Sequence, residues 1–179
     1  GPVGLLSVIG VKYTTARDVA EKTIGLILRT LGRSSATVPG NSSSLPGGEM
    51  DQFDDWRSRL LAARPHGLAD DVLEQLAANY GTECQNVLRE IERDPSLKAR
   101  VAPNASVILA EVVHAVREEM AQTLEDVVFR RTELGTLGHP GEAALEACAE
   151  LTARELQWDR ARMAQELGTV REAFKRRCP

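Results

Sequence analysis

Cysteine, long apolar runs and excess positive charge are all scarce in this sequence. Its three cysteines are odd in number and widely spaced, with no CxxC pair and no zinc-type spacing (Cys84, Cys148 and Cys178). No apolar run approaches the roughly 20 residues of a membrane helix, and the first residues do not resemble a secretory signal peptide. We therefore expect a cytoplasmic protein that is neither exported nor membrane-spanning.

The charge balance argues against a nucleic-acid-binding protein. The formal net charge is -4 and the sequence pI is near 5.5, whereas nucleic-acid binding usually requires a basic surface. Hydrophobic residues make up 42% and charged residues 27%, which is typical of a packed globular protein. At 179 residues, the chain has room for one well-buried core and a smaller appendage.

Strand signals are also scarce, and residues 4–10 hold the only good one. This stretch is apolar and ends in glycine, which indicates a buried strand. A lone strand leaves its backbone N–H and C=O groups unpaired, so its partner strands must lie outside this chain. The alternatives are a first helical turn or a loose end on a helical domain. If the strand is ordered, we expect a second copy or the helical domain to cover it.

A helix is predicted over residues 15–31. Thr14 and Thr15 offer an N-cap, apolar residues recur at spacings of three and four, and Gly32 supplies a C-terminal stop. The next residues are rich in Ser, Gly and Pro, which indicates a flexible connection. We predict a strand-loop-helix segment at 1–32, a linker at 33–50 and an all-helical domain at 51–179.

Every segment after Asp51 is typical of a helix, so the predicted fold class is mainly α. Gly81 ends one helix and Thr82 caps the next, which Asp94 and Pro95 break. Thr123 and Asp126 form a capping box. Further helices are expected at 106–120, with Val112, Ala115, Val116 and Met120 inward, from about 123, at 141–157 and at 159–177.

The segment with the most chemical information joins the predicted strand to the predicted helix. A strand that turns through Gly10 into a capped helix leaves backbone N–H groups at the positive end of the helix dipole. Lys12 adds a full positive charge, so the turn is suited to a phosphate, a carboxylate or the electron-rich edge of a reduced flavin. The alternative is a capped helix with a solvated lysine.

The sequence of this turn resembles a motif of the FAD-dependent glycerol-3-phosphate dehydrogenase family. The usual form of that motif is close to Gly-Gly-Lys-x-Thr-Thr-x-Arg. The matching residues are Gly10, Lys12, Thr14, Thr15 and Arg17, whereas Val11 replaces the second glycine and Ala16 stands where a bulkier residue is common. The resemblance continues into the predicted helical domain. It is carried there by Tyr80-Gly81, Glu111-Val112, residues 117–121, Leu124-Glu125-Asp126 and Arg130-Arg131-Thr132.

The resemblance implies the C-terminal part of an enzyme that oxidises sn-glycerol 3-phosphate to dihydroxyacetone phosphate with FAD, passing electrons to a quinone or oxygen. It implies that residues 1–32 are a strand-loop-helix remnant of an α/β FAD-binding domain and that residues 51–179 are a helical cap domain. It also implies that Gly10, Val11, Lys12, Tyr13, Thr14 and Thr15 face the flavin and that Lys12 is catalytic. The Gly-x-Gly-x-x-Gly fingerprint and the substrate-binding sheet are absent here, so this chain alone is expected to be inactive. Its expected partners are the remainder of the FAD-binding and substrate domains and, in addition, a second copy in a homodimer.

Three other groups of residues favour structural roles. Glu111 and His114 have the spacing of a helical di-metal motif, but a second such pair is missing, so we predict no metal and a helical salt-bridge face. Arg130-Arg131 lie where the helix dipole favours cations. A basic tail at Arg171, Lys175, Arg176 and Arg177 offers peripheral contact with anionic lipid, against which we favour a solvated helix end.

Two other functions remain open at this point. One is a free-standing helical protein-interaction module that carries residues 1–32 as an arm. The other is the same flavoenzyme scaffold acting on another hydroxy acid or an amine.

Overall fold

The computed structural model describes residues 4–10, 12–33, 44–136 and 138–177. The chain divides into two compact units, residues 1–45 and 46–179, each described by itself below. The division falls inside the predicted linker, whose residues 34–43 lie outside the described ranges. The predicted domain bounds stay a prediction.

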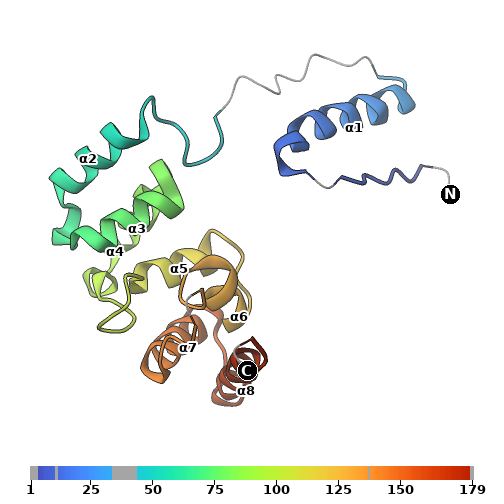
Figure 1. Ribbon diagram of the computed structural model, residues 1–179. Helices are drawn as coiled ribbons and strands as arrows, with labels where there is room; N and C mark the ends of the chain where they lie inside the picture. Colours follow the sequence, from blue (N-terminus) through green and yellow to red (C-terminus); the bar gives the residue numbers. More distant parts are fainter. Residues whose placement is uncertain (1–3, 11, 34–43, 137, 178–179) are drawn as a thin grey trace. The chain divides into compact units, whose positions relative to one another are not determined.

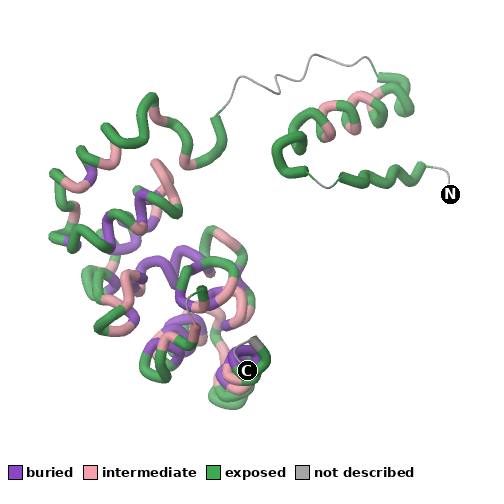
Figure 2. The backbone as a smooth tube through the Cα atoms, in the orientation of Figure 1, coloured by how far each residue is buried: buried purple, intermediate pink, exposed green. Residues whose placement is uncertain are grey.

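The first unit contains a short 3-10 turn, η1 (Tyr13–Thr15), and the helix α1 (Ala16–Thr30). The predicted stop at Gly32 is confirmed, because the N–H of Gly32 donates to the carbonyl of Arg29 and that of Arg33 to the carbonyl of Leu28. This pair of bonds is a Schellman motif, and Gly32 has the positive φ of +65° that the motif requires. No residue of α1 is buried (Figure 2).

The predicted strand at residues 4–10 is wrong for this structure, which assigns no strand there. Leu5 and Ile9 are 67% and 91% exposed, so this segment is not a buried strand. The physical reason is the one that the sequence raised: a strand needs a neighbour for its backbone hydrogen bonds. No strand is assigned elsewhere in the described residues; the nearest feature is an isolated bridge between Arg100 and Ile108.

The second unit is all-helical, as predicted, and its helices follow one another through short turns (Figure 1). The α-helices are α2 (Phe53–Ala63), α3 (Asp70–Tyr80), α4 (Cys84–Arg93), α5 (Leu109–Arg117), α6 (Leu124–Asp126), α7 (Glu142–Leu156) and α8 (Arg160–Arg177). The connecting turns are η2 (Pro65–Gly67), η3 (Gly81–Glu83), η4 (Pro95–Lys98) and η5 (Val127–Arg131), of which η5 is a π-helical turn.

Helix α5 forms the centre of the second unit. It packs against α4 on one side and α7 on the other, and six of its nine residues are buried (Figure 2). Helix α8 is tied to α6 by Glu166, a buried carboxylate that accepts the N–H of Leu124 at 2.9 Å and pairs with Arg162. The core is therefore built around a short apolar helix that the rest of the unit encloses.

Local signals placed several helix ends correctly. Thr123 Oγ1 accepts the N–H of Asp126 at 3.1 Å, and Asp126 Oδ2 accepts the N–H of Thr123 at 3.0 Å, so the predicted capping box is confirmed. Helix α3 ends at Gly81, as predicted, with φ of +55°. One face of α3 is buried at Val72, Leu73, Leu76 and Ala77, and Leu68, just before the helix, is buried too.

Two local predictions are wrong. Thr82 does not cap α4; it lies inside η3, and its hydroxyl is buried without a partner in the described structure. Met120 does not point inward, because α5 ends at Arg117 and Met120 adopts a φ of +59° with 81% of its surface exposed. The N–H of Ala121 returns to the carbonyl of Ala115, and this bond turns the chain away from the helix axis.

Candidate functional site

The predicted cofactor-facing turn lies at the start of α1. Lys12 is the N-cap of η1, with extended backbone angles. Thr15 is the N-cap residue of α1, as predicted, but its side chain makes no capping hydrogen bond. Thr15 instead turns its hydroxyl back, donating to the carbonyl of Lys12 at 3.1 Å. The N–H of Thr15 donates to the same carbonyl and that of Ala16 to the carbonyl of Tyr13.

These bonds define which backbone donors the turn offers. The N–H groups of Thr15 and Ala16 donate to carbonyls inside η1. The first N–H groups of a helical segment, in contrast, have no acceptor within that segment. Those first groups belong to Tyr13 and Thr14. The positive end of the α1 dipole and the exposed Lys12 lie at the same place, so the turn carries positive potential toward solvent.

A cavity of about 710 Å³ adjoins this turn inside the first unit. Its lining brings together Gly10, Lys12 and Tyr13 of the predicted set with one face of α1. The full lining is Val8, Gly10, Lys12, Tyr13, Ala16, Val19, Ala20, Thr23 and Ile24. Thr14 and Thr15 belong to the turn but not to the lining, and Val11 lies outside the described residues.

The residues present fit the edge of a flavin in two respects. A Cβ placed on Gly10 would meet no atom within 4 Å, so a planar group has room to approach the backbone there. The cavity lining combines the apolar side chains of Val8, Val19 and Ile24 with the cation of Lys12. That combination suits an aromatic ring system with one electron-rich edge.

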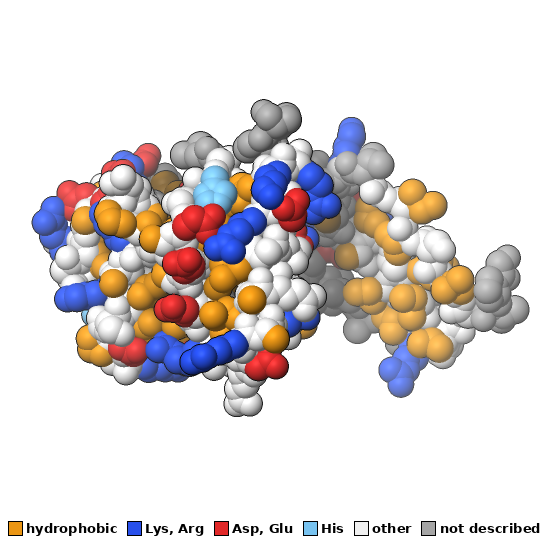
Figure 3. Space-filling view, turned by 90° about the horizontal axis from the view of Figure 1, so that it is seen from below, with side chains coloured by type: hydrophobic (Ala, Val, Ile, Leu, Met, Phe, Trp, Pro, Cys, Tyr) orange, Lys and Arg blue, Asp and Glu red, His pale blue; other side chains and the backbone are white. Residues whose placement is uncertain are grey.

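Helix α1 presents an apolar face that the first unit does not bury. Ile24, Leu26 and Ile27 are 41%, 42% and 41% exposed, and hydrophobic side chains gather on this unit at the right of Figure 3. An amphipathic helix usually buries its apolar stripe. The partner surface for α1 is therefore not supplied by residues 4–33.

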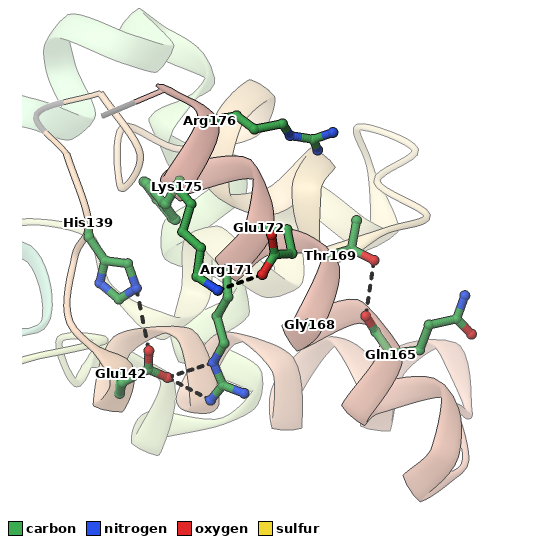
Figure 4. Close-up of a pocket in the computed structure, with 10 residues that line it drawn as sticks. His139, Glu142, Gln165, Gly168, Thr169, Arg171, Glu172, Lys175 and Arg176 are labelled. Atoms are coloured by element: carbon green, nitrogen blue, oxygen red, sulfur yellow. Dashed lines mark hydrogen bonds and ion pairs between the residues drawn. The ribbon is translucent and has the colours of Figure 1, made fainter. Parts of the chain in front are cut away.

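A second cavity, of about 870 Å³, lies between the start of α7 and the outer face of α8 (Figure 4). Arg171 donates two bonds to Glu142, at 2.9 and 2.6 Å, and Lys175 donates to Glu172 at 2.6 Å. Two cations of the predicted basic tail are thus paired with carboxylates, which lowers the charge available to an anionic surface. No helix in the described ranges is long and apolar enough to cross a membrane.

Glu111 and His114 differ from the prediction. They were expected on a salt-bridge face, but both are buried, at 0% and 4% exposure, because α5 is enclosed on all sides. Within the described ranges, no group of three or more His, Cys, Asp or Glu side chains is placed to hold a metal ion. Arg130 does have a structural partner, since its guanidinium donates to Asp126 at 2.8 Å.

The environment of Glu111 was not predicted from the sequence. Its carboxylate accepts bonds from the N–H of Ile108 at 2.9 Å, the amide of Gln75 at 3.1 Å and the hydroxyl of Tyr80 at 3.3 Å. Burial raises the pKa of Glu111 to about 7, more than these three bonds lower it. The signal was available in the sequence, because Glu111 is flanked on both sides by apolar residues from 107 to 116.

Comparison with known proteins adds independent findings. The family model of the C-terminal domain of alpha-glycerophosphate oxidase matches residues 40–163. The mitochondrial glycerol-3-phosphate dehydrogenases of Bos taurus and Homo sapiens are each 32% identical over 176 residues, which cover 94% of this chain and 23% of the relative. Glycerol-3-phosphate dehydrogenase of Synechocystis is 29% identical over 181 residues, covering 99% of this chain and 32% of the relative.

The matches differ in whether they include the turn at residues 10–17. The family model begins at residue 40 and does not include it, whereas the Synechocystis match covers 99% of the chain and so extends through residues 10–17. The chain spans about a quarter to a third of the length of these relatives.

Proposed function

This chain belongs to the family of the C-terminal domain of alpha-glycerophosphate oxidase, and from that premise we propose that it is the C-terminal part of an FAD-dependent oxidoreductase acting on sn-glycerol 3-phosphate. The observation that carries the proposal is the match to glycerol-3-phosphate dehydrogenases along nearly the whole chain, the turn included. The product would be dihydroxyacetone phosphate, with a quinone or oxygen as final electron acceptor.

The first unit would contribute to the flavin pocket. FAD, when bound, supplies the redox chemistry by accepting a hydride from the alcohol carbon. The residues of this chain would hold the ring edge: the N–H groups of Tyr13 and Thr14 would donate to it, and Lys12 would oppose the negative charge that develops on reduction. Gly10 would let the backbone approach closely, Val11 would line the same turn, and Thr15 would fix the turn through its hydrogen bond to the Lys12 carbonyl.

The unburied face of α1 supports a parent polypeptide with more structure than this chain contains. An apolar helix face next to an apolar segment at residues 5–9 requires a covering layer, and strands of an FAD-binding domain would supply it. The second unit would then be a cap. An interaction module is less well supported, since Phe53 and Met120 are the large hydrophobic residues exposed in the described part of that unit.

The test is made on the full-length parent, which on this proposal carries the rest of the FAD-binding domain and the substrate domain. We expect a yellow protein that reduces its flavin with glycerol 3-phosphate but not with lactate or glycine. Lys12→Met should lower kcat at least about tenfold, corresponding to the loss of one charge interaction with the reduced ring. The matched control is Lys22→Met, which removes an exposed lysine paired with Asp18 on the same helix.

Three outcomes would contradict the proposal: a colourless parent that FAD cannot reconstitute, flavin reduction by the other substrates alone, or equal effects of Lys12→Met and Lys22→Met. The isolated chain should show no activity with glycerol 3-phosphate and FAD. Activity in that preparation would show that residues 1–179 are themselves a complete enzyme.

A further inference from the structure

A third cavity lies entirely within the second unit. Its volume is about 420 Å³, which falls in the range of small-molecule sites. Its walls come from α3, from a loop at residues 102–107, from the segment that follows η5 and from Pro140, just before α7. The polar side chains of its lining are Gln75, Asn104, Ser106 and Glu133. None of the lining residues belongs to the turn at residues 10–15, so an occupant of this cavity serves another purpose than holding the flavin.

The loop that forms one wall of this cavity is held in shape by hydrogen bonds. The N–H of Val101 donates to the carbonyl of Val107 at 3.0 Å and closes the loop. Arg100 donates to the carbonyl of Ala105 at 2.7 Å and to both carboxylate oxygens of Asp71, each at 2.7 Å. A wall that is already ordered loses little freedom when a ligand binds. The same bonds pair the charge of Arg100 with Asp71.

The cavity carries negative charge that its own lining does not offset. The Glu133 side chain forms no hydrogen bond or ion pair within the described ranges, and no Lys, Arg or His of those ranges lines the cavity. Further carboxylates are close, because burial raises the pKa of Tyr80 and the charges of three carboxylates raise it further (Glu111, Glu119 and Glu133). A recess lined by one sign of charge concentrates ions of the opposite sign. The cavity therefore favours a cation.

Gln75 links the cavity to the buried carboxylate of Glu111. Its Nε2 donates to Glu111 Oε2 at 3.1 Å, and the Tyr80 hydroxyl donates to the same oxygen at 3.3 Å. With the N–H of Ile108 on Oε1 at 2.9 Å, these donors suit an ionised carboxylate, which has no cationic partner in the described ranges. Gln75 Oε1 is itself buried without a donor. A positively charged donor on the cavity side would satisfy Oε1 and oppose the charge of Glu111.

We propose that this cavity binds a small organic cation, an alkylammonium, whose N–H groups donate to Glu133 and to Gln75 Oε1 while its apolar stem lies against Val107, Leu134 and Pro140. An ammonium has three donors and no acceptor, which matches a site that offers acceptors. The apolar part of the lining favours an organic ligand over a bare metal ion, for which the described ranges hold no group of three or more suitable side chains. Gln75 Oε1 is covered in this structure, so a shift of the Gln75 side chain accompanies binding.

The test is a titration of the full chain with butylammonium at pH 8 and constant ionic strength, followed by nitrogen-15 NMR. At that pH most of Glu111 is ionised, because burial sets its pKa at about 7. We expect saturable shifts at the side-chain amide of Gln75 and at the backbone N–H groups of Ser106 and Val107. Butanol and butyrate, which lack the cation, should bind at least about tenfold more weakly. Tetramethylammonium, which has the charge but no N–H donor, should also bind more weakly.

Two exposed glutamates supply the variant and its control. Glu133→Gln removes the charge at the cavity and should weaken butylammonium binding by roughly twofold to fivefold. Glu150→Gln removes an exposed carboxylate of α7 outside the lining and should leave binding unchanged. The proposal is overturned if the shifts grow without saturation, if tetramethylammonium binds as tightly as butylammonium, or if the two variants bind alike.

Discussion

The backbones of Gly47 and Gly81 touch where residues 46–48 cross the end of α3. A Cβ on Gly81 would lie 2.0 Å from the carbonyl oxygen of Gly47, and a Cβ on Gly47 would lie 2.5 Å from the carbonyl oxygen of Tyr80. Both glycines also have positive φ, +82° and +55°. Neither position accepts a side chain, so the crossing requires glycine twice.

Gly81→Ala should therefore destabilise the second unit by about 2–4 kcal/mol, combining backbone strain with a clash against backbone atoms. The matched control is Gly168→Ala on α8, where a Cβ meets nothing within 4 Å and alanine favours the helix by up to about 1 kcal/mol. Urea unfolding of both variants measures the difference. Equal stability of the two would show that the crossing is not rigid.

The pH dependence of stability should have two separate parts. Because the pKa of Glu111 rises from 4.5 to about 7 on folding, the folded state holds that proton more tightly. The stabilisation is full below pH 4.5 and is lost as the pH rises toward 7, by roughly 3 kcal/mol. Glu111→Gln should flatten this window. Unfolding free energies at half-unit intervals of pH measure it, and a wild-type curve flat between pH 4.5 and 7 would contradict the assignment.

The second part lies at lower pH. Hydrogen bonding to Arg100 lowers the pKa of Asp71, and the Asp126 pKa is also lowered, because bonds from Gln122, Thr123 and Arg130 outweigh its burial. These carboxylates stabilise the folded state above their ordinary pKa of 3.8, and the contribution is lost as the pH falls through their folded values. We expect Asp126→Asn to reduce the acid sensitivity below pH 4 without changing the window between 4.5 and 7.

The sequence was sufficient for several features that depend only on neighbouring residues. Helix α1 ends where the N–H of Gly32 donates to the carbonyl of Arg29 and the N–H of Arg33 to that of Leu28, and Thr123 with Asp126 caps a helix within one turn. Such bonds form within the segment that encodes them. The buried face of α3 follows the same rule, because the spacing of residues along the chain alone determines which side chains share one face of a helix.

The sequence was insufficient where distant contacts decide. Met120 continues the apolar spacing of α5, but the chain turns at Glu118 so that the N–H of Ala121 can reach Ala115. Thr82 has a side chain suited to a cap, yet it lies inside η3. Its N–H donates to the carbonyl of Gly47, which is more than thirty residues away in the sequence. The motif at residues 10–15 was recognised from its sequence. The hydrogen bond from the Thr15 hydroxyl to the Lys12 carbonyl could be seen only in the structure.

The two described cysteines should resist modification in the folded protein. Cys84 and Cys148 are both buried, and burial raises the pKa of the first thiol to about 11 and of the second to about 12. The reactive thiolate is therefore almost absent at pH 8. Iodoacetamide at pH 8 should leave peptides containing either residue unlabelled by mass spectrometry, and the same treatment in urea should label both. Rapid native labelling of Cys148 would show that α7 separates from α5.

Arg117 joins three helices, and replacing it should lower the stability of the folded state. Its guanidinium donates two bonds to Glu155 on α7, at 2.7 and 3.0 Å, and one to Glu90 on α4 at 2.7 Å. Glu90 is 2% exposed, so removing this partner leaves a buried carboxylate with Arg93 alone. We expect Arg117→Met to destabilise the folded state by about 1–3 kcal/mol.

The matched control for Arg117→Met is Lys175→Met, which breaks an exposed pair with Glu172 on α8 and should leave stability unchanged. A double-mutant cycle with Glu155→Gln then separates the two partners of Arg117. Coupling confined to Glu155 would mean that Glu90 is satisfied by Arg93. A sum of single effects with no coupling at all would show that the three-helix junction is held by apolar packing, with the charges acting only through solvation.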